Sequence, residues 1–516
     1  MRRTALSLVV VALLALVAGG TPSLAAPSAR PTGTAGSSGS TRAEPVGRSA
    51  GRPWVPADGV RATHPGGNTI GTQVREAEPR SDGYRHIDTP RLIARLTALH
   101  VNTFYFTVWD EPTDWQDLTT EFAPAAQRAG IRVWVGLAPP SECFPNDDAH
   151  LAGRCSRPYQ TDFLTWAKQV AQLSTRYPNV VAWAIDDFLI GDNAKLFTHE
   201  YLAHMRRITT SINPDLGLYT IAYYDTAVDP DFYAKYGDVI DGIVYPYLGR
   251  DNNTNDASAV ADNLDTILPL ADKRNLSVIL LDYSGRLLDS VLAPTARYVD
   301  EVLDVGMRYT REHKIDGVIS YGTQLTGENL TDPSQGPRQG DGRLALTVAP
   351  HTGTQTGDYA QVSQRVTVDP NSPRYELSWW HRDPYYGGTD GYHVKQVLID
   401  GKVIWQSDVS DWFNFMWVNG SDTQGPMDVT QFVQGKKAVT IAFRLYEKKG
   451  VGDFYVDATF DHLSSVGLTI HDPGFEDPSA WTVGGNSRHV DATVFVYHRD
   501  EPERIFGTVA DHFARP

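Results

Sequence analysis

Residues 177–188 read YPNVVAWAIDDF. The run from Val180 to Ile185 is apolar and rich in β-branched and aromatic residues, which is typical of a short strand that is buried on both faces. Two adjacent carboxylates, Asp186 and Asp187, follow it directly. In barrels that alternate strands and helices, the chemistry lies at the carboxyl ends of the strands. The stretch therefore predicts a buried parallel strand that delivers two acidic side chains to a barrel mouth.

The chain around this stretch alternates strand-like and helix-like segments, from about residue 68 to about residue 330. Strands are expected at 69–74, 102–108, 132–137, 180–185, 217–221, 242–247, 277–282 and 317–322. Helical patterns lie between them, for example at 90–99, 163–177, 200–212, 258–273 and 296–313. Eight such units in roughly 260 residues match the usual size of a TIM barrel. A doubly wound open sheet is the alternative, but it more often has fewer strands and a glycine-rich first turn.

The pattern changes after residue 326, where short alternating strands replace the helices. These strands are expected at 343–348, 359–368, 374–380, 393–399, 402–406, 438–446 and 452–460. They predict an antiparallel β-sandwich that resembles a jelly roll. The expected organisation is a signal peptide at 1–26, a disordered linker at 27–52, a barrel at 53–335 and a sandwich at 336–516.

The N-terminus predicts export. Arg2 and Arg3 precede an apolar core and a small-residue cleavage site that ends at Ala26. No later stretch reaches membrane-spanning length, so we expect a secreted, extracellular protein with no membrane partner. Cys143 and Cys155 are the only 2 cysteines, and in an exported protein such a pair is expected to form a disulfide.

The composition and the absence of certain motifs argue against several classes of function. The net charge of −16 argues against nucleic-acid binding, and it disfavours strongly anionic substrates unless a local basic cleft overrides it. The 12 Trp and 24 Tyr favour a protein that packs sugar rings on aromatic faces, although large cores also bury aromatic residues. Motifs of metal sites, kinases, dehydrogenases and serine hydrolases do not occur. We expect a monomer that requires no cofactor.

Acidic and aromatic residues crowd the predicted strand ends. Two like charges side by side at a half-buried position repel each other, which raises the pKa of at least one of them. A carboxyl group that stays neutral near neutral pH is useful as a general acid. The candidate catalytic residues are Asp187, Asp186 and Asp282. The candidate substrate contacts are Trp109, Asp110, Glu111, Tyr224, Tyr245, Tyr247, Tyr283, Tyr321 and Gln324.

Two mechanisms of glycosidic bond cleavage fit these residues. In the first, a carboxylate after 180–185 is the general acid and Asp282 is the nucleophile, about 5 Å away across the cleft. In the second, Asp186 and Asp187 divide the work: one orients the 2-acetamido group of the substrate as nucleophile, and the other protonates the leaving oxygen. Neighbouring side chains in a strand point to opposite faces, so the second mechanism requires that the strand has ended by Asp186.

The approach at 177–183 resembles strand 4 of the large clan of retaining β/α-barrel glycoside hydrolases, in which an Asn-Glu pair carries the acid/base. This chain has Asp186 and Asp187 there, and Asp282 where that clan has Glu. The Asp-Asp pair is instead similar to that of the β-N-acetylglucosaminidases that include O-GlcNAcase, which use substrate assistance. The resemblance implies a glycoside hydrolase, and the export signal adds that it is secreted and acts on an extracellular polysaccharide or oligosaccharide. Asp187 is the preferred general acid. Its partner is Asp186, which would orient the acetamido group, or Asp282 as the nucleophile.

Two other function classes stay open. One is a barrel that binds glycans without cleaving them. The other is a polysaccharide lyase or esterase, which a basic cleft around Arg250 and Arg286 would favour.

The sandwich carries aromatic residues that resemble those of carbohydrate-binding modules, although several of them would also suit a core. They are Trp379, Trp380, Tyr385, Tyr386, Tyr392, Trp405, Trp412 and Trp417. Asp453, Asp457 and Asp461 are candidate ligands for a structural Ca²⁺ ion.

Overall fold

The computed structural model describes residues 67–143, 155–287, 290–325, 335–385, 391–409, 416–420, 425–450, 452 and 454–515. The predicted signal peptide and linker lie outside these residues. In the described part of the chain, no helix combines the length and the apolar character needed to cross a membrane.

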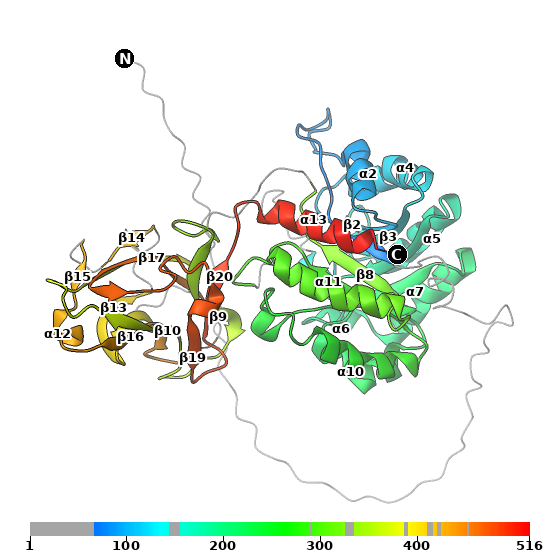
Figure 1. The fold of residues 1–516 in the computed structure, drawn as a ribbon. Helices are drawn as coiled ribbons and strands as arrows, with labels where there is room; N and C mark the ends of the chain where they lie inside the picture. The colour runs from blue at the N-terminus through cyan, green and yellow to red at the C-terminus, as the bar shows by residue number, and fades with distance from the viewer. Residues whose placement is uncertain are drawn as a thin grey trace, which may run out of the picture. The chain divides into compact units, whose positions relative to one another are not determined.

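Eight parallel strands close into a barrel, in which each strand pairs with its sequence neighbours and β8 pairs with β1 (Figure 1). The strands are β1 Asn68–Ile70, β2 Thr103–Val108, β3 Arg132–Leu137, β4 Val180–Ile185, β5 Gly217–Ile221, β6 Gly242–Pro246, β7 Ser277–Tyr283 and β8 Gly317–Tyr321. The predicted TIM barrel is confirmed. The prediction for β4 matches its bounds, whereas β1 ends four residues before the predicted end at Val74.

Helices lie between the barrel strands in sequence, and the longer ones cover the outside of the barrel. They are α2 Thr89–Ala98, α3 Asp114–Asp117, η1 Leu118–Phe122, α4 Ala123–Arg128, η2 Pro140–Glu142, α5 Phe163–Arg176, α6 Asn193–Leu196, α7 His199–Ile212, α8 Tyr224–Ala227, α9 Pro230–Tyr236, η3 Arg250–Asn252, α10 Val260–Asp272 and α11 Ala296–Arg311. Several helices begin at a side-chain cap. Asp88 accepts a hydrogen bond from the backbone N–H of Arg91, and Thr295 accepts one from that of Tyr298.

Two buried layers explain why the barrel strands are apolar throughout. Alternate residues such as Phe104 and Phe106 face the helices, while Tyr105 faces the barrel interior. Inside the barrel, the rings of Trp134 and Tyr219 lie with their centroids 4.3 Å apart. Because both faces of each strand are buried, the sequence shows no alternation of polar and apolar residues.

Two antiparallel sheets form the predicted β-sandwich. One has the strand order β13-β12-β16-β10-β18, with β19 also paired to β10, and the other has the order β14-β11-β17-β9-β20, with β15 also paired to β11. The elements are β9 Gly342–Thr352, β10 Tyr359–Val368, β11 Glu376–Tyr385, β12 His393–Ile399, β13 Lys402–Asp408, β14 Val418–Asn419, β15 Met427–Asp428, α12 Thr430–Val433, β16 Ala438–Glu447, β17 Phe454–Val466, β18 Leu468–Thr469, η5 Pro478–Ala480, β19 Thr482–Gly485 and β20 Asp491–Val496. Trp379, Phe443 and Phe460 lie in the apolar core of this sandwich.

The last helix, α13 (Glu501–Phe513), packs on the barrel beside α11. Phe513 belongs to the same buried cluster as the barrel helices, and its carbonyl accepts a hydrogen bond from Asn68 Nδ2 (2.9 Å) in β1. Glu501 accepts one from the backbone N–H of Ala296 (2.6 Å), at the start of α11. Among the described residues no helix lies between β8 and β9, so α13 takes the position of an eighth barrel helix. The predicted range 336–516 had grouped this helix with the sandwich.

Candidate active site

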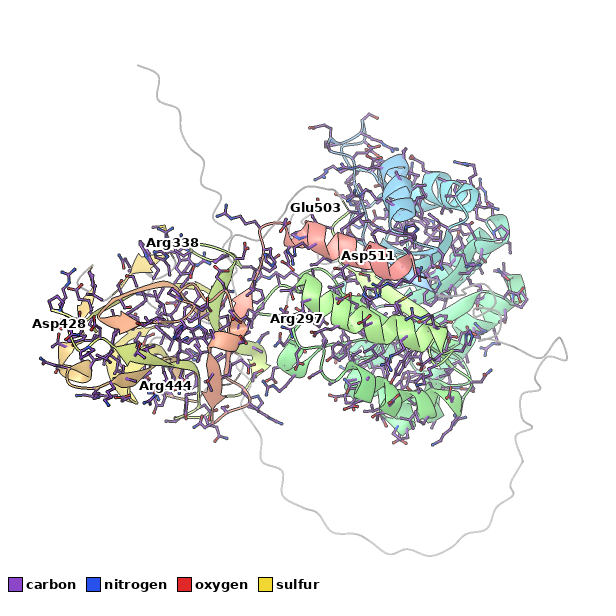
Figure 2. The ribbon with its side chains drawn as sticks, in the orientation of Figure 1. Arg297, Arg338, Asp428, Arg444, Glu503 and Asp511 are labelled. Atoms are coloured by element: carbon purple, nitrogen blue, oxygen red, sulfur yellow. A yellow bond between two sulfur atoms is a disulfide. The ribbon has the colours of Figure 1, made fainter. Side chains whose placement is uncertain are left out.

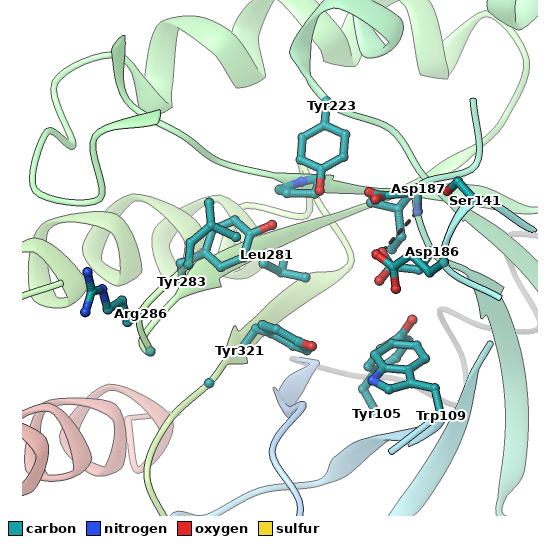
Figure 3. A pocket seen from close by; sticks show the side chains of 16 residues that line it. Tyr105, Trp109, Ser141, Asp186, Asp187, Tyr223, Leu281, Tyr283, Arg286 and Tyr321 are labelled. Carbon is teal, nitrogen blue, oxygen red and sulfur yellow. Dashed lines mark hydrogen bonds between the residues drawn. The ribbon is translucent and has the colours of Figure 1, made fainter. Parts of the chain in front are cut away.

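A pocket of about 420 Å³ lies at the carboxyl ends of the barrel strands (Figure 3). Of the predicted site residues, it brings together Trp109, Asp186, Asp187, Tyr283 and Tyr321. Polar and aromatic residues that the sequence prediction did not select also line it, namely Tyr105, Ser141, Glu142 and Tyr223. The pocket therefore combines three carboxylates with a wall of tyrosines.

The two aspartates follow the end of β4 at Ile185. The backbone N–H of Asp186 still donates to the carbonyl of Leu137 in β3 (3.0 Å), but Asp187 adopts a left-handed conformation with φ of 40°. Asp is among the residues that tolerate this conformation. Because the extended backbone has ended, the two side chains do not alternate, and both carboxylates point into the pocket (Figure 3). This geometry meets the requirement for two neighbouring aspartates to act on one substrate.

Asn193 fixes the turn that carries the aspartates. Its side-chain amide donates to the carbonyl of Asp187 (2.7 Å) and to Ser141 Oγ (2.9 Å), and its Oδ1 accepts from the backbone N–H of Ser141 (2.8 Å). Asn193 is fully buried. It ties the end of β4 to the segment after β3 that carries Glu142, so three carboxylates are held on one side of the pocket.

Tyrosines line much of the rest of the pocket. Burial raises the pKa of Tyr105 well above its usual value, and the charge of Asp186 raises it further. Burial also raises the pKa of Tyr223 and of Tyr283, and both aspartates add to the increase. The hydroxyl of Tyr223 donates to that of Tyr283, which opposes the increase at Tyr283. These three hydroxyls therefore stay neutral near two carboxylates.

Two glycines make room for the aromatic wall. A Cβ atom at Gly136 in β3 would lie 2.7 Å from the ring of Tyr105, which stands on β2. A Cβ atom at Gly71, just after β1, would lie 2.7 Å from the ring of Tyr321. Each tyrosine thus leans across a neighbouring strand that has no side chain at the point of contact.

Asp282 does not reach the pocket. Leu281 and Tyr283 line the pocket, and the side chain between them in β7 faces the other way, as alternation in a strand requires. Asp282 is fully buried and accepts a hydrogen bond from Ser284 Oγ (2.5 Å). Burial raises its pKa to about 7, although hydrogen bonds from Ser284 and Ser320 oppose this increase. The expected pair across the cleft is therefore not assembled.

Three predicted tyrosines also lie outside the pocket lining. Tyr245 and Tyr247 belong to the buried cluster between strands and helices, because Val244 is the residue that faces the barrel interior. The hydroxyl of Tyr245 accepts a hydrogen bond from Asn263 (2.9 Å), and that of Tyr247 donates to the carbonyl of Asp256 (2.8 Å). Tyr224 is 38% exposed, and its neighbour Tyr223 lines the pocket instead.

The remaining predicted contacts divide between two places. Asp110 lines a second hollow beside the pocket, whereas Glu111 and Gln324 line neither. Arg286 lines the main pocket, but Arg250 does not. The predicted disulfide between Cys143 and Cys155 is present, with Cα atoms 4.3 Å apart.

The aromatic residues of the sandwich are occupied by protein contacts. Trp379 and Trp405 lie in the core. The guanidinium groups of Arg338 and Arg382 lie over the rings of Trp380 and Trp417, at 4.4 and 4.6 Å from the ring centroids. The side-chain label of Arg338 marks this region in Figure 2. Tyr386 and Trp412 lie outside the described residues.

The predicted calcium ligands have other partners. Asp457 forms a buried ion pair with Arg343 (2.9 Å). Asp461 accepts hydrogen bonds from the backbone N–H groups of Arg338 (2.6 Å) and Gln339 (3.0 Å), while Asp453 lies outside the described residues. In the described part of the chain, the acidic and histidine groups close enough to share an ion are His86 with Asp117 and Glu121, and Asp300 with Asp304 and His512.

No family model matches the chain, and no curated protein does. Among solved structures, the chain is similar to a glucosidase from Croceicoccus marinus, with 11% identity, a TM-score of 0.37, and coverage of 73% of this chain and 95% of that one. It is also similar to β-glucuronidase 2 from Bacteroides uniformis, with 8% identity, a TM-score of 0.35, and coverage of 72% and 62%. Xylanases and a chitinase are further similar structures. At these scores the likeness carries no argument, and the function is inferred from the site.

Proposed function

We propose that this barrel is a secreted glycoside hydrolase that cleaves O-glycosidic bonds of an extracellular glycan, with Asp186 and Asp187 as its catalytic pair. The observation that carries the proposal is the turn after β4, which directs both carboxylates into one pocket walled by tyrosines. Paired carboxylates beside a sugar-sized cavity are the equipment of glycosidic bond cleavage. The signal-like N-terminus supports the expectation of export.

The two aspartates divide the work of a substrate-assisted reaction. Asp187, as a carboxylic acid, gives its proton to the glycosidic oxygen as the bond to the anomeric carbon breaks. Asp186 accepts a hydrogen bond from the acetamido N–H, so that the acetamido oxygen attacks the anomeric carbon and forms a cyclic intermediate. Asp187, now a carboxylate, then takes a proton from a water molecule, and the resulting hydroxyl opens this intermediate. Asp282 has no part in this scheme because it lies on the other face of β7.

The tyrosine wall supports this reaction in two ways. The hydroxyls of Tyr105, Tyr223 and Tyr283 stay neutral, so they can donate to or accept from sugar hydroxyls without adding charge to a pocket that already holds carboxylates. The negative charge of Asp186 lies where positive charge develops on the sugar ring in the transition state. Trp109 and Tyr321 offer aromatic surface for the apolar face of the ring.

Glu142 defines a second arrangement of the same reaction class. It lines the pocket from the segment after β3, so it is the remaining carboxylate that can serve as a nucleophile while Asp187 serves as the acid. In this arrangement the substrate needs no acetamido group.

The test is product release from nitrophenyl glycosides with and without a 2-acetamido group, together with a series in which the acetyl group carries one, two or three fluorine atoms. Substrate assistance predicts cleavage of acetamido sugars alone, with rates that fall steeply as fluorine is added. Asp186→Asn should abolish that activity, and Glu142→Gln should retain it. Cleavage of sugars without an acetamido group, lost in Glu142→Gln, would replace the first arrangement with the second.

A polysaccharide lyase is the other candidate, because Arg286 lines the pocket and could neutralise a uronate. Asp186 and Asp187 would repel such a carboxylate in the same pocket, which favours the hydrolase. The two reactions differ in their products, because a lyase releases unsaturated uronates that absorb ultraviolet light. Binding of a glycan with no product of either kind would instead support a barrel that binds without cleaving.

A further inference from the structure

A second hollow of about 360 Å³ adjoins the proposed catalytic pocket. Trp109, Tyr321 and Gly322 line both cavities, so the two share a wall. The rest of the second hollow comes from the segment after β1 and the end of β2, on the side of the mouth away from β4.

A network of hydrogen bonds holds the polar wall of this hollow in place. Arg75 Nη2 donates to Gln73 Oε1 and to Asp114 Oδ1, both at 2.7 Å, and Arg75 Nη1 donates to the carbonyl of Arg85 (3.1 Å). Gln73 Nε2 in turn donates to the carbonyl of Thr107. Asp114 is fully buried, and its second oxygen accepts from the backbone N–H of Asp110 (2.9 Å). The wall is therefore organised before any ligand arrives, which lowers the entropic cost of binding.

The groups that face the hollow suit a neutral, hydroxylated ligand. Thr72 Oγ1 is buried and has no hydrogen-bond partner among the described residues. Arg85 is exposed, and its Nε donates to the carbonyl of Glu76 (2.9 Å). Asp114 (2.7 Å) and Asp110 (3.6 Å) balance the charge of Arg75, so the hollow has no excess of positive charge that would favour an anion. Donors, acceptors and one indole together match the hydroxyl groups and apolar face of a sugar ring.

We infer that the second hollow is a subsite for the neutral sugar residue next to the one held at Asp186 and Asp187. This inference rests on the proposed function, because it takes the main pocket as the place where the bond is cleaved. The ligand that fills the site then has at least two sugar units, with Trp109 and Tyr321 in contact with both of them where the two cavities meet. Arg85 is a specificity-determining residue that binds hydroxyls of the second ring.

The test compares binding of one and two sugar units by titration calorimetry. The probes are N-acetylglucosamine and diacetylchitobiose, glucose and cellobiose, xylose and xylobiose, and mannose and mannobiose. Asp187→Asn protein is used for any pair that the wild type hydrolyses. In the pair that the protein binds, the disaccharide should bind at least about tenfold more tightly, as expected for added hydrogen bonds to a charged donor.

Arg85→Ala should remove that gain while leaving the affinity for the single unit within about twofold. Arg297→Ala is the matched control, because this arginine lies on the outer surface of α11 with 81% of its side chain exposed (Figure 2). The inference would be overturned if the protein bound one and two sugar units with equal affinity, or bound neither member of any pair. It would also be overturned if the tighter binding of the disaccharide persisted in Arg85→Ala. If the disaccharide bound more tightly than the single unit but no glycoside were hydrolysed, the subsite would be supported and only the proposed function would be contradicted.

Discussion

The barrel mouth and the sandwich carry the same kinds of residues but use them differently. At the mouth, Asp186 and Asp187 and the surrounding tyrosines face a cavity. In the sandwich, Asp457 pairs with Arg343, and Trp380 lies under Arg338. Residue type alone predicted a ligand site in both places. The difference lies in the surroundings of each side chain: Asp457 and Trp380 of the sandwich are covered by arginines, whereas Asp186 and Asp187 of the mouth line a cavity.

This comparison distinguishes charged residues that stabilise the sandwich from charged residues that can act on a substrate at the barrel mouth. Buried charges in the sandwich occur as pairs, such as Arg343 with Asp457 and Lys395 with Asp383 (2.6 Å), as expected where water is excluded. At the mouth, Asp186, Asp187 and Glu142 line one pocket. Like charges held together cost stability, and such a cost is typical of functional sites.

Breaking an ion pair of the sandwich should have the largest effect on stability. Asp457→Ala leaves Arg343 buried without its carboxylate, which should lower the free energy of unfolding by about 3–5 kcal/mol. Chemical denaturation measures this loss. Glu301→Ala, which breaks an exposed pair with Arg297 (2.9 Å), is the control and should cost less than about 1 kcal/mol. If Asp457→Ala instead abolished hydrolysis in protein that remained folded, this result would contradict a purely structural role for the ion pair of the sandwich.

The pH dependence of stability should reveal the buried carboxyl of Asp282. Its pKa is about 7 in the folded protein. In the unfolded chain the value is about 3.9, so between these values the folded state holds the extra proton, and stability falls as pH rises. The fall should amount to about 2–3 kcal/mol between about pH 5 and about pH 8.

Asp282→Asn isolates this contribution from that of Asp114, whose pKa burial also raises, to about 6. Urea unfolding of the variant and the wild type at both pH values gives the difference. A stability difference between the two proteins that does not change with pH would show that Asp282 titrates normally.

At the mouth, loss of one tyrosine hydroxyl should have a moderate effect. Tyr283→Phe keeps the ring but removes the hydroxyl that accepts from Tyr223, and it should lower kcat/KM by about tenfold. Tyr224→Phe, a tyrosine outside the pocket lining, is the matched control and should leave kcat/KM unchanged. Equal effects of the two changes would argue that the wall does not contact substrate.

The smallest effect is expected at the sandwich tryptophans. Because Arg338 already covers the ring of Trp380, Trp380→Ala should change the affinity for glycans by less than about twofold. Trp109→Ala at the mouth should weaken binding far more. Affinity electrophoresis in gels that contain soluble polysaccharides compares the two variants, and a strong loss in Trp380→Ala would restore the sandwich as a glycan-binding domain.

The sequence predicted the barrel, the sandwich and the bounds of β4, because long alternation of strand and helix patterns is a strong signal. It did not predict which side chains of each strand face the pocket. Tyr224, Tyr245, Tyr247 and Asp282 all lie next to a residue that lines the pocket. Strands buried on both faces have no alternation of polar and apolar residues, so the sequence does not indicate which of two neighbouring residues faces the pocket.

Other features depend on contacts between distant segments. Tyr105 sits in an apolar strand, and its role depends on the gap at Gly136 in the neighbouring strand. Asn193 is polar and near Asp187 in sequence, but its bonds to Ser141 require the pairing of β3 with β4. α13 follows the sandwich in sequence and packs beside α11, so no local pattern assigns it to the barrel.

We expect the carboxylates after β4 to carry the chemistry and the buried acid of β7 to take no part in it. The most direct measurement is product release by wild type, Asp187→Asn and Asp282→Asn, on whichever glycoside the wild type cleaves fastest. We expect kcat of Asp187→Asn to fall by about 10²–10⁴-fold, as for the loss of a general acid, and that of Asp282→Asn to stay near the wild-type value. Wild-type activity in folded Asp187→Asn, or loss confined to folded Asp282→Asn, would contradict this assignment.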